Sequence, residues 1–167
     1  MSYSIPIRKI ALLAAKAEDG GIAYYRKIAG RVKDDQIKEF CLFFAEQEQE
    51  HKEFFEKIAA ETNPEAKGLF TVDVISLMNQ GIKRLAETGF QSPSFDVSKM
   101  DVDQALELAL HLEQETIAIY EKIRQAMGHN YNVALYKIIH EEDKHAQTIE
   151  NVINKRHPER KRPLSGS

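Results

Sequence analysis

The sequence has little of what disulfide-bonded, turn-rich or membrane-spanning proteins need. It contains one cysteine, Cys41, no tryptophan, eight glycines and five prolines. A single cysteine excludes an internal disulfide and any metal site with four cysteine ligands. Cys41 lies in an apolar run, which predicts a buried, unreactive thiol and points to a reducing, cytoplasmic compartment. No apolar stretch approaches the ~20 residues that cross a bilayer, so we expect no membrane segment.

The chain also lacks a strong charge of either sign. Its 23 basic and 26 acidic side chains give a formal net charge of −3, so we expect no general attraction to nucleic acid or to an anionic membrane. Basic residues do gather at the C-terminus, where Pro158 and Pro163 disfavour regular structure. We interpret residues 158–167 as a flexible basic tail. Residues 1–157 are long enough for one domain with a buried core.

The N-terminal segment resembles a secretion signal, because Arg8 and Lys9 precede a run of apolar residues. The run is only six residues long, which is shorter than a usual secretory core, and the helical pattern continues through it. We therefore interpret it as the first turns of a mature helix.

Four amphipathic segments, with apolar residues three and four positions apart, predict an all-α fold. The predicted helices span about 6–30, 35–60, 101–128 and 130–157. Short turns join the first helix to the second and the third to the fourth, so each pair should form an antiparallel hairpin. Residues 61–100 form a long connection with one further helical segment, about 72–88, for which Thr71 is the expected cap. A connection this long allows the third helix to start at the far end of a four-helix bundle.

The two predicted hairpins resemble each other in sequence. Residues 18–28 align with residues 113–123, and six of the eleven positions are identical. A Glu-x-x-His motif follows in each half, at residues 48–51 and at residues 142–145. An internal repeat of this kind implies two similar hairpins related by a pseudo-two-fold axis.

Each half supplies one glutamate from its first helix and one Glu-x-x-His motif from its second. Positions i and i+3 share a helix face, so both side chains of a motif can reach one point. One such motif is weak evidence, but the full set in both halves predicts two metal ions, each with one histidine and one terminal glutamate and with two glutamates as bridges. The predicted ligands are Glu18, Glu48, His51, Glu113, Glu142 and His145.

Several neighbouring residues allow two interpretations. Tyr25 and Tyr120 lie two helical turns after Glu18 and Glu113, so they either pack in the core or donate a hydrogen bond to a metal-binding carboxylate of the other hairpin. The glycines at 20 and 21 permit either a close helix approach or local loosening. The remaining histidines, which we interpret as surface or cap residues, are His111, His129, His140 and His157.

Motifs at residues 18–25, 45–51, 112–120 and 141–145 make most of the chain resemble the rubrerythrin branch of the ferritin-like superfamily. The resemblance implies a ferritin-like bundle, a di-iron site, and reaction with hydrogen peroxide or of ferrous iron with oxygen. The sequence departs from the family at Thr116, where many rubrerythrins carry an additional carboxylate, and at its counterpart Gly21. It also has no rubredoxin-type centre with four cysteines, so an external electron donor is expected.

The predicted function is a di-iron oxidoreductase that reduces hydrogen peroxide or oxygen. Oxidation of ferrous iron for storage or detoxification stays open, because it uses the same ligands. A non-catalytic metal-binding protein also stays open, because nitrogen and oxygen ligands suit zinc and manganese as well. We expect two iron ions per chain. The apolar residues of the connection, Leu69 and Phe70 among them, together with the resemblance, predict a homodimer or larger assembly.

Overall fold

The computed structural model describes residues 2–71, 76, 80, 100–127 and 129–160. In chain order the elements are β1 (Ser2–Pro6), α1 (Ile7–Ala29), α2 (Asp35–Glu61), β2 (Lys67–Thr71), α4 (Val102–Met127), α5 (His129–Arg156) and a 3-10 helix, η3 (Pro158–Arg160). The four predicted helices are confirmed, and each end lies within one residue of its expected position. The helix predicted at residues 72–88 falls largely outside the described residues.

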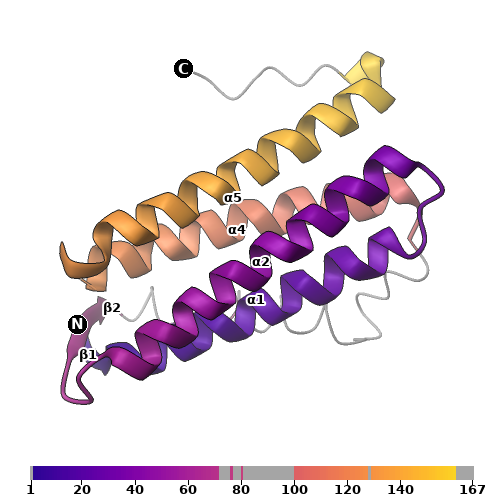
Figure 1. The fold of residues 1–167 in the computed structure, drawn as a ribbon. Helices are drawn as coiled ribbons and strands as arrows, with labels where there is room; N and C mark the ends of the chain where they lie inside the picture. The colour runs from indigo at the N-terminus through magenta and orange to yellow at the C-terminus, as the bar shows by residue number, and fades with distance from the viewer. Residues whose placement is uncertain (1, 72–75, 77–79, 81–99, 128, 161–167) are drawn as a thin grey trace.

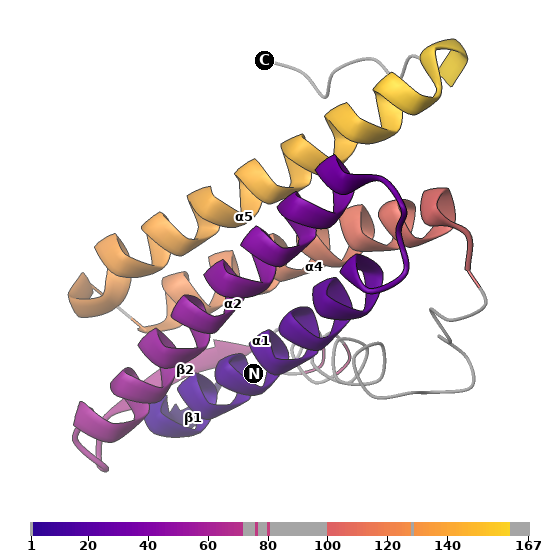
Figure 2. The same ribbon diagram turned by 45° about the vertical axis from the view of Figure 1, so that its right-hand side comes forward.

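The helices form a bundle of two antiparallel hairpins, α1 with α2 and α4 with α5 (Figure 1). The end of α1 lies beside the start of α4, where Arg31 donates a hydrogen bond of 3.3 Å to the Met100 carbonyl. In contrast, α2 leads into β2, and Gly68 of that strand lies against the Ala126 carbonyl near the end of α4. The ends of the connection between β2 and α4 therefore lie at opposite ends of the bundle (Figure 2). This is the predicted long crossover.

Local sequence signals fix where the helices begin. Asp34 caps α2, because its Oδ1 atom accepts hydrogen bonds from the backbone nitrogens of Gln36 and Ile37 at 3.0 and 3.1 Å. Asp101 and Gln104 form a capping box before α4, with reciprocal hydrogen bonds of 2.8 and 3.0 Å. Such a cap stabilises a helix by about 1 kcal/mol.

The sequence did not predict the two strands. β1 pairs with β2 in antiparallel register from Ser2–Thr71 to Pro6–Lys67. Thr71, the expected cap of a helix, is the last residue of β2. Each strand has only five residues, and their pairing joins segments far apart in the sequence, which a local pattern cannot predict. The sheet carries Phe70 into the core, where its side chain is fully buried.

The interior of the bundle is apolar along most of its length. Cys41 is fully buried there, and burial raises the pKa of its thiol to about 12, which keeps it protonated at neutral pH. Tyr24 is also buried, and its hydroxyl donates a hydrogen bond of 2.7 Å to the Ala105 carbonyl, which joins α1 to α4. Within the described residues, none of the helices combines the length and apolar character of a membrane span.

The described part of the predicted tail begins with η3. Just before it, the Nε2 atom of His157 lies 3.0 Å from Oδ2 of Asp103, so the end of α5 is attached to the first turn of α4. Residues 161–167 lie outside the described part of the chain. The division into a bundle and a flexible tail remains a prediction.

Candidate metal centre

Six ionisable side chains meet in the middle of the otherwise apolar bundle. None of them is more than 4% exposed. Each of the four helices contributes, and the six are Glu18 of α1, Glu48 and His51 of α2, Glu113 of α4, and Glu142 and His145 of α5. Buried glutamates are rare unless a partner compensates their charge. The predicted site residues are therefore brought together at one buried point.

The cluster consists of two overlapping groups with two shared glutamates. The groups are Glu18, Glu48, His51 and Glu142, and Glu48, Glu113, Glu142 and His145. In each group, one ligand atom from every residue lies within 4.8 Å of the others. Ligand atoms about 2.0–2.2 Å from one ion lie at most about 4.4 Å apart, so this spacing needs only a small contraction. Each group contains one histidine and one glutamate that the other lacks.

The Nδ1 atoms of both histidines face the cluster. Nδ1 of His51 lies 3.0 Å from Oε1 of Glu142, and Nδ1 of His145 lies 3.2 Å from Oε2 of the same carboxylate. Both Nδ1 atoms and both Glu142 oxygens are buried and have no hydrogen-bond partner of good geometry within the described residues. Buried polar atoms normally have partners. A pair of cations between these atoms would satisfy all four, so the residues fit a two-metal site.

The Nε2 atoms point outward to side chains that the sequence interpretation did not assign. Nε2 of His51 lies 3.0 Å from Oε2 of Glu141, and Nε2 of His145 lies 2.8 Å from Oε1 of Gln47. Such contacts fix the ring orientation and favour a free Nδ1 for a metal. The signal was present in the sequence, because each partner directly precedes the motif glutamate of the opposite hairpin.

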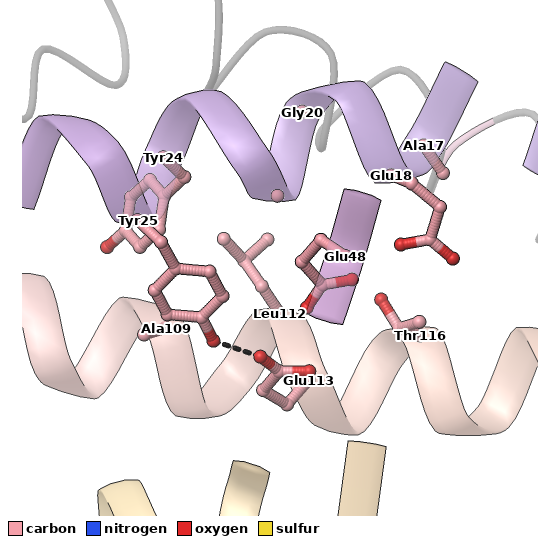
Figure 3. A pocket seen from close by; sticks show the side chains of 11 residues that line it. Ala17, Glu18, Gly20, Tyr24, Tyr25, Glu48, Ala109, Leu112, Glu113 and Thr116 are labelled. Atoms are coloured by element: carbon pink, nitrogen blue, oxygen red, sulfur yellow. Dashed lines mark hydrogen bonds between the residues drawn. The ribbon is translucent and has the colours of Figure 1, made fainter. Parts of the chain in front are cut away.

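Two tyrosines connect the hairpins at the carboxylates. The hydroxyl of Tyr25 donates to Oε1 of Glu113 (Figure 3), and the hydroxyl of Tyr120 donates to Oε1 of Glu18. Burial, together with the neighbouring carboxylates, raises the pKa of both tyrosines well above the ordinary value. Both therefore remain neutral donors at physiological pH.

Burial and mutual repulsion control the protons of the two unshared glutamates. Burial, followed by the charges of Glu48 and Glu142, raises the pKa of Glu18 and Glu113 well above the ordinary value. Like charges this close cannot all be ionised at once. In the metal-free protein we therefore expect Glu18 and Glu113 to retain protons that a metal would displace.

The histidines behave in the opposite way. Burial alone would lower their pKa values, but contacts with Glu142 and Glu48 outweigh it, raising the pKa of His51 to about 12 and that of His145 to about 10. The same contacts overcome the effect of burial on Glu48 and lower its pKa well below the usual range. Without metal, the cluster is held together by charged pairs of histidine and glutamate.

A small cavity of about 20 Å³ adjoins the cluster between α1 and α4 (Figure 3). Glu18, Glu48 and Glu113 line it together with Gly21 and Thr116. A Cβ atom at Gly21 would lie 3.4 Å from the side chain of Glu48, so the glycine leaves space beside this carboxylate. The cavity has room for about one water-sized molecule.

The other histidines with described side chains lie away from the cluster. His111 is exposed, with its Nε2 atom 3.4 Å from Glu115, and His140 is also exposed. His157 contacts Asp103 at the end of the bundle. The side chain of His129 lies outside the described part of the structure.

The fold and the cluster together define a four-helix bundle with a buried carboxylate–histidine site. The sequence model of the Rubrerythrin family matches residues 9–153, and the chain belongs to this family. Among solved structures, the chain matches one from Thermotoga maritima that is described as a ferritin-like diiron-carboxylate protein, with a TM-score of 0.68 and 18% identity. The match covers 91% of this chain and 97% of the other, and it shows the ferritin-like fold. None of the curated proteins compared with the chain matches it.

Proposed function

We propose that the protein is a di-iron oxidoreductase that reduces hydrogen peroxide or oxygen with electrons from an external donor. The observation that carries the proposal is the pair of overlapping ligand groups that share Glu48 and Glu142. Four carboxylates balance the charge of two divalent ions, and each group adds one imidazole. Membership of the Rubrerythrin family favours iron, although manganese and zinc accept the same ligands.

In this proposal the six residues divide into two terminal pairs and two bridges. Glu18 and His51 would hold one ion, and Glu113 and His145 would hold the other. Glu48 and Glu142, which belong to both groups, would be available to each ion. When bound, iron supplies the electrons that reduce the substrate, and paired ions can stabilise both of its oxygen atoms.

The surrounding residues control geometry and access. Tyr25 and Tyr120 hold the terminal carboxylates from the opposite hairpin. The cavity beside Gly21 has room for a molecule of about the size of water, and oxygen and hydrogen peroxide are close to this size. Reduction of one peroxide to two waters consumes two electrons and two protons. Glu18 and Glu113 give up their own protons when they bind the ions, so the protons for this reaction come from solvent.

The electrons come from outside the chain in this proposal. With a single cysteine, the sequence cannot hold a four-cysteine iron centre. A reducing cytoplasm with a small electron-transfer protein would supply this need. Both the donor and the compartment are part of the proposal.

Anaerobic mixing of the diferrous protein with hydrogen peroxide tests the proposal. We expect one peroxide to oxidise two ferrous ions per chain, followed by an absorption rise near the ultraviolet that a chemical reductant reverses. The exposed variant Glu46→Gln, on the same helix as Glu48, serves as a control and should react like the wild type. Repeated oxidation of excess ferrous iron by oxygen would favour iron handling instead. A loaded site that is inert to both oxidants would favour the non-catalytic alternative.

A further inference from the structure

The two halves of the cluster are nearly symmetric, but their outer partners differ. The sequence repeat pairs Gln47 with Glu141, since each directly precedes a Glu-x-x-His motif. Glu141 accepts from Nε2 of His51 at 3.0 Å, whereas Gln47 accepts from Nε2 of His145 at 2.8 Å. One histidine therefore has a carboxylate behind it and the other a neutral amide.

This difference acts on the ring atom that faces the metal. A carboxylate that accepts the Nε2 hydrogen pulls that hydrogen toward itself and leaves more electron density on the ring. Nδ1 therefore becomes a stronger electron donor. Hydrogen bonds to an ionised group are roughly twice as strong as those between neutral groups. Replacing such a partner typically changes metal affinity by about 10–100-fold.

The surroundings of Glu141 screen little of its negative charge, so the charge acts on His51. Its side chain is only 24% exposed, and Oε2 is the atom that contacts His51. Lys137 lies 3.8 Å from the other oxygen, but the lysine side chain is 79% exposed. An ion pair this exposed is weak and is screened by solvent. It therefore offsets only part of the negative charge behind His51.

We propose that Glu141 and Gln47 make the two metal positions unequal, so that the position at His51 binds a divalent cation more tightly and fills first. The position at His145, supported by an amide, fills second. This inference rests on the proposed metal site. Glu141 and Gln47 are positioning residues, because they act through the histidines and do not bind the metal themselves.

Titration of the metal-free protein with cobalt(II), followed by visible absorption and calorimetry, tests the inference. The wild type should bind two ions in two steps, and His51→Ala should remove the tighter one. Glu141→Gln should weaken the tighter step about tenfold, and Gln47→Glu should strengthen the weaker step by a similar factor. In the double variant that exchanges both residues, the order should reverse, so that His51→Ala then removes the weaker step.

The exchange separates this inference from simple repulsion between two ions, which also produces two steps but no dependence on residues 47 and 141. Glu46→Gln, which removes an exposed charge on the same helix, should leave both steps unchanged. Melting of each metal-free variant, followed by circular dichroism, checks that the fold is intact.

Several results would overturn the inference. Equal weakening of both steps by Glu141→Gln would indicate a general structural role for Glu141. An unchanged order of binding in the exchanged variant would reject the proposed inequality. If that variant still bound two ions, the proposed function would stand. If the wild type bound no cobalt, both the inference and the metal site would fail.

Discussion

At the scale of single residues, ionising the buried glutamates costs free energy, and binding a metal ion offsets that cost. The pKa of Glu113 is raised first by burial and then by the charges of Glu142 and Glu48. Each unit by which a pKa is raised costs about 1.4 kcal/mol when the group is forced to ionise. A metal ion removes this conflict, because the carboxylate then gives up its proton to become a ligand.

Glu113→Gln should therefore affect the metal-free and metal-bound proteins in opposite directions. The amide cannot ionise, and its oxygen can still accept the Tyr25 hydrogen bond. We expect the metal-free variant to melt higher than the metal-free wild type, by about 2–4 °C for each kcal/mol gained. Metal affinity should fall, because a carboxylate ligand is lost. Calorimetric melting and a metal titration measure the two effects.

The control for this prediction is Glu46→Gln, an exposed change with the same loss of charge on the neighbouring hairpin. It should move neither the metal-free melting temperature nor the affinity appreciably. If Glu113→Gln leaves both quantities unchanged too, Glu113 does not face a shared metal site.

At the scale of the elements, the small sheet is held against the bundle by a tight contact at Gly68. A Cβ atom there would lie 2.6 Å from Cε2 of Phe70 and 2.9 Å from the Ala126 carbonyl oxygen. The carbonyl belongs to the backbone of α4 and cannot easily move. Glycine at this position therefore allows β2 to pack on the end of α4.

Gly68→Ala should destabilise the protein by about 1–3 kcal/mol, the usual cost of overpacking. Thermal or urea-induced unfolding measures this loss. Lys67→Ala is a suitable control, because Lys67 is an exposed residue of the same strand and such changes usually alter stability by less than about 0.5 kcal/mol. Equal stability of both variants would show that β2 does not pack closely on α4.

The elements also show which parts of the structure the sequence could predict. The four helices depend on local patterns of apolar residues, and the structure confirms them. The convergence of the two Glu-x-x-His motifs followed from helix periodicity and the internal repeat. The pairing of β1 with β2 was missed, because it depends on contacts between distant segments. The contacts of Gln47 and Glu141 with the histidines were missed. Each residue directly precedes a motif glutamate in the sequence, but its partner lies in the other hairpin and becomes visible only when the two hairpins are assembled.

At the scale of the whole molecule, stability without metal should depend on pH. The histidine pKa values rise from 6.5 to about 12 for His51 and about 10 for His145. A raised pKa stabilises the fold fully below the unfolded value and progressively less as pH rises through the folded value. The raised pKa values of Glu18 and Glu113 also make stability fall as the pH rises. Above about pH 4.5 these two glutamates ionise in the unfolded chain but keep their protons in the folded protein.

The metal-free protein should therefore lose stability as the pH rises from about 6.5 through about 10 and on toward about 12. The metal-bound protein should change less, because an ion in place of the proton on Nδ1 keeps the cluster together. Melting both forms at several pH values measures the gap, which should widen as the pH rises. If the melting temperature of the metal-free protein stays constant or rises over this range, the two histidines and the two glutamates do not carry the protons assigned to them.

Self-association is the second prediction at this scale. Apolar side chains remain exposed on the described surface, among them Leu12 at 50% and Phe43 at 54%. Burial of such side chains against a second copy would be favourable. We expect sedimentation at micromolar concentration to give at least twice the chain mass of 19.1 kDa. A monomer at these concentrations would reject the homodimer.

The central claim is that two metal ions lie between the helices and share Glu48 and Glu142. Anomalous diffraction from crystals of the iron-loaded protein, collected on both sides of the iron absorption edge, tests it most directly. We expect two iron peaks, one at Glu18 and Nδ1 of His51 and the other at Glu113 and Nδ1 of His145. A single peak, or iron bound only at the surface, would contradict it.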